Sequence, residues 1–414
     1  MRRVLVPPSR VHDKKWWREY TELAVLFFLH AMAMGIWFVP LGSVLDAHGL
    51  THIKAYAYAT SGISAFISPL IFGALADRHI APVRLLRWLA LATALAMTLA
   101  TTAIKFHWST AAILVLIQIH ALCATPTWSI STTIVLAKLS NAKREFGPIR
   151  AMATLGWIAG CLLVSALHAD GSTLAGYGGV VAWFVVAAFT FTLPSVAPPA
   201  QTEHLSWKQR LGLDALSLLK NRDHCVVFIA AALYNMPLCA FYPQTPMHLK
   251  SLGLESTTAW MTLGQITEVI AMFGLAGLLA RWRLKTVILT GIGVGVLRYI
   301  LCALDSKWWL LTGITLHGFA FVLVYITVQL YLEQRIDPRW RARAQALLTL
   351  LLSGFGNLFG YLGCGAWFKA STSGNVTHWP QFWGGLAACV AAVWVFFALA
   401  YKGRAANEDG RSAR

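Results

Sequence analysis

Ionisable side chains inside long apolar stretches are the residues of this sequence best placed to do chemistry. Of the 17 acidic residues, only Glu268 lies near the middle of such a stretch. Gln265 precedes it by one helical turn and shares its face if the segment is helical. A carboxyl group stripped of water can bind and release a proton near neutral pH, or it can act only as a hydrogen-bonded structural group. We predict that Glu268 binds a proton and that Gln265 lies beside it.

A second group, around Arg150, could hold a polar ring. Arg150 and Thr154 are four residues apart and share a helical face, and Trp157 lies about one turn further along. A guanidinium can donate hydrogen bonds to hydroxyl groups while an indole stacks on the ring. The alternative for Arg150 is that it only reaches to the membrane surface. We predict that these three residues contact a hydroxylated, ring-shaped solute.

Polar and aromatic residues of three further apolar stretches complete the candidate site. His317 is either a hydrogen-bonded core residue or a residue that faces the substrate. It precedes Phe321 by four residues, and an aromatic side chain on the same face suits a ring-shaped ligand. Tyr242 offers a polar edge in the stretch that also holds Asn235. Arg298 lies inside a fourth stretch, where we expect a gating or structural role.

The elements that position these side chains must be membrane-spanning helices. Apolar residues make up 57% of the chain and charged residues 12%, too few to cover the surface of a soluble protein. A helix of roughly 20 apolar residues crosses a hydrocarbon core. The sequence predicts an all-α membrane protein with twelve such spans, near 21–45, 55–77, 83–104, 110–137, 148–168, 177–197, 225–249, 256–280, 285–304, 308–333, 342–368 and 380–401.

The basic residues alternate strictly between the two sides of these spans. The two tails and every second loop hold 28 of the 34 Lys and Arg residues. This alternation is the positive-inside pattern, which predicts that both termini are cytoplasmic. Because the basic residues lie in tails and loops and form no soluble face, we expect no nucleic-acid partner. The seven Cys residues are scattered singly, so we expect neither a disulfide nor a metal site.

Internal repetition divides the spans into two halves. The segment 73–78, which follows the second span, is repeated 204 residues later as 277–281 after the eighth. The same offset superposes Gly49 on Gly253. Small residues followed by a basic turn, in two parallel halves, resemble the major facilitator transporters, whose signature would give Gly73, Asp77 and Arg78 a gating or structural role. The expected parts are an amino tail (1–20), an N-terminal six-helix bundle (21–197), a cytoplasmic connector (198–224), a C-terminal six-helix bundle (225–401) and a carboxyl tail (402–414).

Within that superfamily the chain resembles the bacterial nucleoside–proton symporters over nearly its whole length. The motifs that carry the resemblance are 146–150, 211–215, 265–268 and 341–346. The resemblance implies a proton as coupling ion, no other cofactor, and Glu268 as the proton-linked carboxylate. It also implies a nucleoside cavity lined by Arg150, Thr154, Trp157, Gln265, Glu268, His317 and Phe321.

Departures from the family pattern keep other functions open. Val322 occupies a position that is acidic in the nucleoside symporters. The Arg150-to-Trp157 spacing, Arg298 and His317 resemble the lactose-permease group, whose acid aligns with Ala320. The alternatives are a proton-coupled sugar or oligosaccharide transporter, an uncoupled facilitator, or a membrane sensor on a transporter fold, which the short tails disfavour. We predict a nucleoside–proton importer, monomeric in the bilayer of a bacterial inner membrane, and not an enzyme, because no catalytic constellation is present.

Overall fold

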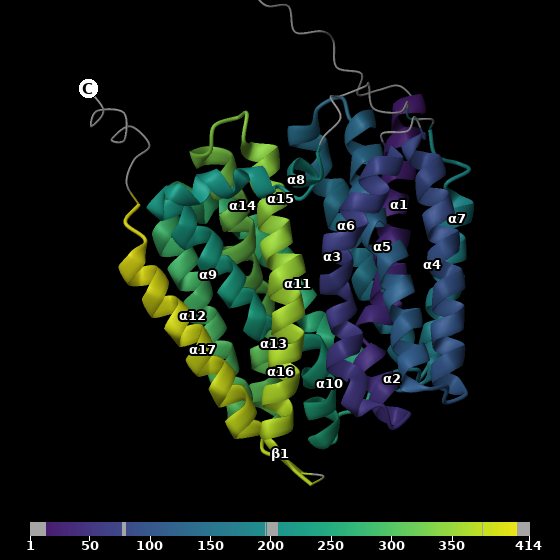
Figure 1. The fold of residues 1–414 in the computed structure, drawn as a ribbon, viewed down its shortest axis with the longest axis vertical. Helices are drawn as coiled ribbons and strands as arrows, with labels where there is room; N and C mark the ends of the chain where they lie inside the picture. Colours follow the sequence, from purple (N-terminus) through teal and green to yellow (C-terminus); the bar gives the residue numbers. More distant parts are fainter. Residues whose placement is uncertain (1–13, 77–79, 195, 197–205, 375, 404–414) are drawn as a thin grey trace, which may run out of the picture.

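The chain folds into two helical bundles that stand side by side (Figure 1). The computed structural model describes residues 14–76, 80–194, 196, 206–374 and 376–403. The N-half consists of α1 (Lys14–Phe38), α2 (Leu41–Ala47), η1 (Thr51–Ile53), α3 (Lys54–Ala76), α4 (Pro82–Lys105), α5 (Thr110–Lys138), α6 (Ala142–Ala166) and α7 (Thr173–Phe189).

A short connector leads to the C-half, and contains α8 (Trp207–Arg210) and η2 (Leu213–Lys220). The C-half consists of α9 (Arg222–Leu238), α10 (Phe241–Ser251), α11 (Thr257–Arg281), α12 (Leu284–Ala303), α13 (Lys307–Phe321), η3 (Val322–Ile326), α14 (Thr327–Arg335), α15 (Arg341–Thr349), η4 (Leu350–Gly356), α16 (Asn357–Ala370) and α17 (Trp379–Ala400). The segments η3 and η4 are π-helical turns. The strands β1 (Thr372–Ser373) and β2 (Val376–Thr377) form a small hairpin at one end.

Within the described residues these helices group into twelve spanning segments, six in each half. Ten of them are long and apolar enough to cross a membrane. The other two are α3, with 23 residues, and α7, with 17. The predicted all-α membrane fold with two six-helix bundles is thereby confirmed.

The sixth span lies earlier in the chain than its predicted range of 177–197. It begins at Thr173 because the Ser172 side chain accepts a hydrogen bond from the Leu174 amide. It ends near Thr190, where Arg87 donates to both the hydroxyl and the carbonyl oxygen. A cation at a helix C-terminus stabilises the last unpaired carbonyls. The apolar residues that follow Thr190 had extended the prediction too far.

The sequence repeat is visible as a repeat of backbone geometry. The first helix of each half breaks once, between α1 and α2 and again between α9 and α10. Gly49 and Gly253 then both take a positive φ, 72° and 76°. In each copy the next residue, Leu50 or Leu254, closes the helix end on a carbonyl five residues back. The same local structure at both positions supports the division into related halves.

The halves meet mainly at three places: α3 packs on η4 and α16, α6 packs on α11, and α2 packs on α10. Small residues permit the close approach. A Cβ atom at Gly62 of α3 would lie 2.9 Å from the Leu358 Cα atom of α16. Close contact between helix backbones is how apolar helices gain packing energy where lipid removes the hydrophobic driving force.

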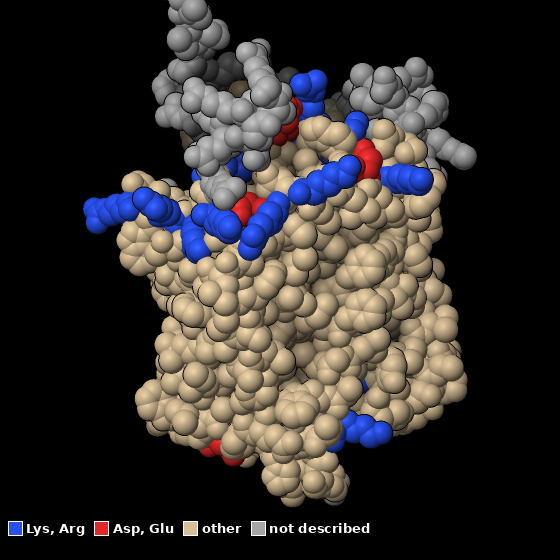
Figure 2. Space-filling view, turned by 60° about the vertical axis from the view of Figure 1, so that its left-hand side comes forward, with Lys and Arg blue, Asp and Glu red and all other residues tan. Residues whose placement is uncertain are grey.

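On the surface of the molecule, charged side chains lie mainly at the two ends. Figure 2 shows Lys and Arg gathered in a band at the upper end of this face, with few at the lower end and an uncharged belt between them. An uncharged belt flanked by unequal basic ends is the surface of a membrane protein with one preferred orientation.

Candidate substrate cavity

A cavity of about 420 Å³ lies between the two halves. Its size falls in the range that holds a small organic molecule. All eight residues predicted as substrate-binding line it: Arg150, Thr154, Trp157, Tyr242, Gln265, Glu268, His317 and Phe321. The structure thus brings together side chains from four helices, α6, α10, α11 and α13, which are far apart in the sequence.

The N-half wall is formed mainly by α6. Thr154 lies one turn from Arg150, and Trp157 lies about a turn further along the same helix. The Arg150 guanidinium lies 5.0 Å from the ring centroid of Trp128, which comes from α5. An indole face holds a guanidinium by cation–π attraction while its N–H groups remain available. This wall can therefore donate several hydrogen bonds to hydroxyl or carbonyl oxygens.

Aromatic rings from both halves form one part of the wall. Trp157 lies 6.1 Å from Tyr242 and 6.1 Å from Phe38, and Phe38 lies 5.3 Å from Tyr242, measured between centroids. Phe38 is the last residue of α1, just before the break in the N-half. Tyr242 lies in the first turn of α10, just after the break in the C-half. Gln265 donates from Nε2 to the Tyr242 hydroxyl at 3.2 Å. Rings arranged in this way offer flat apolar surface with polar edges, which suits a heterocycle or a sugar ring.

Glu268 supplies the carboxylate among the described lining residues. It lies on α11 one turn after Gln265, and it interacts electrostatically with Arg150 of the other half. Gly318 of α13 leaves no room for a side chain against the α11 backbone at Glu268. This tight crossing fixes the α11 backbone and with it the direction of the carboxylate.

His317 and Phe321 line the cavity from α13, and their rings lie 6.1 Å apart. Arg298 of α12 does not line the cavity but lies behind His317, 1% exposed. Of the other residues predicted to have gating or structural roles, Gly73 lies in α3, and Asp77 and Arg78 lie outside the described residues. Within the described part of the chain, no three His, Cys, Asp or Glu side chains gather as a metal site.

Five polar or aromatic lining residues were not among the eight predicted ones: Phe38, Trp128, Asn235, Asn357 and Tyr361. Asn235 donates to the Asn357 side chain at 2.9 Å and accepts from the Tyr325 hydroxyl at 2.9 Å. Asn235 adds a polar edge to the same apolar stretch as Tyr242, and Asn357 carries the same signal in the sequence, an amide inside an apolar span. Trp128 and Tyr361 carry no signal of this kind, since aromatic residues are common in every span.

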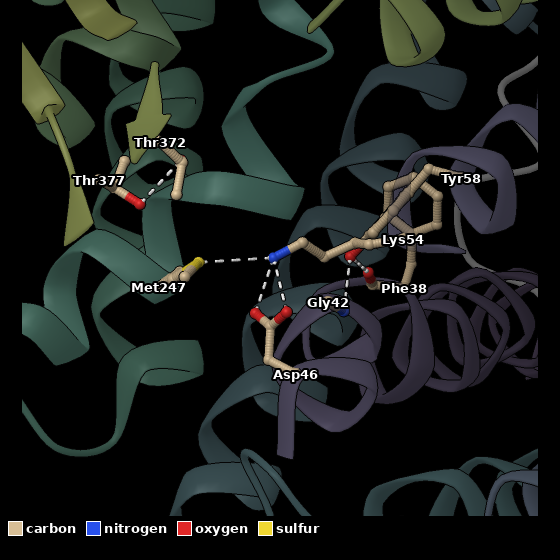
Figure 3. Close-up of polar contacts among 8 residues, drawn as sticks. All are labelled: Phe38, Gly42, Asp46, Lys54, Tyr58, Met247, Thr372 and Thr377. Atoms are coloured by element: carbon tan, nitrogen blue, oxygen red, sulfur yellow. Dashed lines mark hydrogen bonds and ion pairs between the residues drawn. The ribbon is translucent and has the colours of Figure 1, made fainter. Parts of the chain in front are cut away.

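The end of the cavity at α2 and α10 is closed by contacts between the halves. Lys54 is buried and donates to both oxygens of Asp46, at 2.9 and 2.7 Å, and it also contacts the Met247 sulfur of the C-half (Figure 3). The Tyr58 hydroxyl donates to the Phe38 carbonyl and accepts from the Gly42 amide. These bonds stabilise the break between α1 and α2 where it meets α10.

A second set of contacts on the same side joins the end of α6 and the loop that follows it to the start of α11. Asp170 accepts from the Thr258 amide at 2.6 Å, and the Ser165 hydroxyl accepts from the Ala259 amide at 2.9 Å. Ser256, which precedes α11, makes no side-chain cap of its own. Residues of the N-half therefore cap α11 of the C-half, and both hydrogen bonds must break for this end of the cavity to open.

Twelve spans in two related bundles, with a polar cavity between them that is closed at one end, define a secondary transporter of the major facilitator fold. The chain belongs to the nucleoside H+ symporter family, whose sequence profile matches residues 19–406. It is therefore a transporter and not an enzyme, and a multi-pass protein of the inner membrane.

Individual relatives agree with this assignment. The YegT protein of Escherichia coli is 30% identical over 92% of this chain and 93% of its own. The nucleoside permease NupG of Escherichia coli is 26% identical over 87% of this chain and 91% of its own. A crystal structure of a variant of the nucleoside transporter NupG has the same fold, with a TM-score of 0.85 and 24% identity over 92% of this chain and 100% of that one.

Proposed function

We propose that this protein imports nucleosides together with protons, by exposing the cavity to each side of the membrane in turn. The observation that carries the proposal is a polar and aromatic cavity with the Glu268 carboxylate in its wall, in a chain of the nucleoside H+ symporter family. The aromatic group of Phe38, Trp157 and Tyr242 would stack on a ring of the solute. Arg150, Thr154 and Gln265 would hydrogen-bond its polar edges.

Transport follows from the protonation of Glu268 and the rocking of the halves. With the cavity open to the outside, Glu268 would take a proton as the nucleoside binds, which removes a charge from the membrane interior. The contacts of Asp170 with the start of α11 would then re-form and close the outer end. On the cytoplasmic side the lower proton activity would restore the carboxylate and release the solute.

We place the basic end of the molecule in the cytoplasm, with both termini on that side. The basic band in Figure 2 supports this orientation, because cytoplasmic ends carry the excess of Lys and Arg. The closed end at α2 and α10 would then face the outside. A monomer suffices for this mechanism, because one chain supplies the whole cavity, and the uncharged belt would contact the lipid bilayer.

Single cysteines test the orientation. Lys54 lies at the closed end, but it is 2% exposed and paired with Asp46, so it is unsuitable for labelling. Lys250 and Lys208 are exposed at opposite ends. In a variant without native cysteines, an impermeant maleimide added to whole cells should label Lys250→Cys and spare Lys208→Cys until the membrane is opened. Labelling of Lys208→Cys in intact cells would reverse the orientation.

Uptake into transport-deficient cells tests the substrate class. Cells that express the protein should accumulate labelled uridine or adenosine, and excess unlabelled nucleoside should abolish the signal, whereas lactose should not. An uncoupler should stop accumulation, since the driving force is the proton gradient. Accumulation of a labelled disaccharide in place of nucleosides would favour the sugar transporter, and nucleoside entry unaffected by the uncoupler would favour the facilitator.

A further inference from the structure

A buried cation lies behind the C-half wall of the cavity. The Arg298 guanidinium lies 4.8 Å from the centroid of Phe241 and 4.7 Å from that of Tyr299. Among the described residues, no carboxylate lies within ion-pair distance of it. Its recorded hydrogen bond joins Nη1 to His317 Nδ1 at 2.7 Å, and its Nε has no partner. A buried guanidinium that is not paired with an acid is costly, so the one bond it makes is informative.

The Arg298 bond determines which nitrogen of His317 carries the proton. A guanidinium has five N–H donors and no acceptor, and it stays charged in proteins. The His317 Nδ1 atom must therefore accept, which requires an unprotonated Nδ1. A neutral imidazole with a bare Nδ1 carries its proton on Nε2, and an imidazolium is excluded because it would place a hydrogen on Nδ1. His317 is thus a neutral ring with an Nε2–H donor.

Packing holds this ring in one orientation. The imidazole stacks on Phe241 with centroids 4.0 Å apart and planes 9° from parallel. On the α11 side, a Cβ atom at Gly264 would lie 3.1 Å from His317 Cδ2, so the ring edge lies directly against that helix. His317 lines the cavity, and no hydrogen bond to its Nε2 is recorded among the described residues. The donor therefore remains available to a ligand.

The charges around His317 oppose a second proton on the ring. Arg298 contributes a full positive charge from α12 at hydrogen-bond distance. The side chains that face the site from other elements are Glu268 and Gln265 on α11 and Tyr242 on α10, and of these Glu268 carries the negative charge. The adjacent cation also polarises the imidazole, which strengthens the outward N–H as a donor.

We propose that Arg298 is a positioning residue that holds His317 as a fixed Nε2–H donor, so that the C-half wall recognises a hydrogen-bond acceptor of the substrate. The identity of this acceptor rests on the proposed function: in a nucleoside it is a carbonyl oxygen or an unprotonated ring nitrogen of the base. His317 then selects the substrate and carries no transported proton. Proton coupling is then left to Glu268, because Ala320 of α13 and Val322 of η3, which align with acidic residues of related families, cannot carry a proton.

Nitrogen NMR of the purified protein with labelled histidine tests the tautomer without any substrate. The His317 signals, assigned by their loss in His317→Gln, should show an unprotonated Nδ1 and a protonated Nε2. They should stay unchanged between about pH 5 and pH 8, the range in which an ordinary histidine titrates. A proton on Nδ1, or a titration of His317 within this range in the unmodified protein, would overturn the proposal.

The second experiment repeats this NMR measurement in Arg298→Met, which removes the guanidinium and keeps much of the bulk of the side chain. In Arg298→Met the ring loses its fixed donor, so His317 should show a mixture of tautomers and should titrate. A purely structural role of Arg298 would leave the His317 nitrogen signals as they are. If Arg298→Met does not fold, the signals of the unmodified protein still decide the question.

Measuring uridine binding distinguishes the contribution of the Nε2–H donor from that of the bulk of the His317 ring. In His317→Gln the amide nitrogen can reach the place of Nε2, so affinity should stay within a few-fold. His317→Asn is the matched control, because its shorter amide cannot reach that place, and it should weaken binding about tenfold, as the loss of one buried hydrogen bond does. Equal binding by Gln and Asn variants would contradict the donor role. If the unmodified protein does not bind uridine, the proposed function fails, and the NMR result alone decides the tautomer.

Discussion

Glu268→Gln should still bind nucleosides but should no longer accumulate them against a gradient. Glutamine keeps the shape and most of the hydrogen bonding of a protonated glutamate but cannot ionise. The variant would therefore mimic the proton-loaded state permanently. In that state the halves can exchange nucleoside across the membrane, while no proton is released inside to make the cycle one-directional. Inside and outside concentrations of labelled uridine should become equal in energised cells.

A matched control lies just before the same helix. Glu255 is exposed and does not line the cavity, so Glu255→Gln should accumulate uridine as the unmodified protein does. Binding of uridine to purified Glu268→Gln, measured by calorimetry, should remain. Normal accumulation by Glu268→Gln would remove this carboxylate from the coupling mechanism.

Replacing Trp157 should have the second largest effect, and on binding rather than on coupling. Its ring packs with Phe38 and Tyr242 at the junction of the halves and lines the cavity. Trp157→Ala would remove the stacking surface and leave Phe38 and Tyr242 without their neighbour, so uridine affinity should fall about tenfold or more. Trp157→Phe retains a flat ring, and the indole N–H that it removes has no partner. It should keep transport with a changed affinity.

Trp88 provides the control for removing a large aromatic side chain. It is 63% exposed on α4, where it faces the surroundings of the molecule, so Trp88→Ala should leave uridine affinity unchanged. Unchanged affinity in Trp157→Ala would mean that Trp157 only packs the junction between the halves.

The number and order of the spans follow from sequence because membrane thickness and chain charge act locally. Each apolar run had to cover the hydrocarbon core, and each basic turn had to lie on one side. The sixth span was misplaced because its end depends on Arg87, which lies in another helix and donates to Thr190. An interaction between helices leaves no mark on local hydropathy.

The lining residues that could be predicted from sequence are those that are polar inside an otherwise apolar span. Glu268, Gln265 and His317 are polar where lipid or packing would favour apolar side chains, and all three line the cavity. Trp128 and Tyr361 line it as well, but only the tertiary arrangement distinguishes them from other aromatic residues. The burial of Lys54 was equally hidden, because its ion pair with Asp46 forms only when η1 turns the chain back.

The hydrogen bond between Arg298 and His317 could not be predicted from the spacing of these residues in the sequence. In the sequence both are isolated polar residues in neighbouring spans, and a histidine in such a place can be a proton carrier or a packing residue. The 2.7 Å bond between them assigns the histidine proton to Nε2. The assignment depends on which atom faces which, and this is set by the packing of α12 against α13.

The pH of lightly buffered vesicles on addition of nucleoside tests the central claim most directly. Vesicles that contain the unmodified protein should take up protons when uridine is added outside, because each nucleoside enters with a proton that Glu268 carries. Vesicles with Glu268→Gln should show uridine exchange without a pH change, and empty vesicles should show neither. Uridine entry through the unmodified protein with no proton movement would contradict the symport mechanism and leave Glu268 as a binding residue of a facilitator.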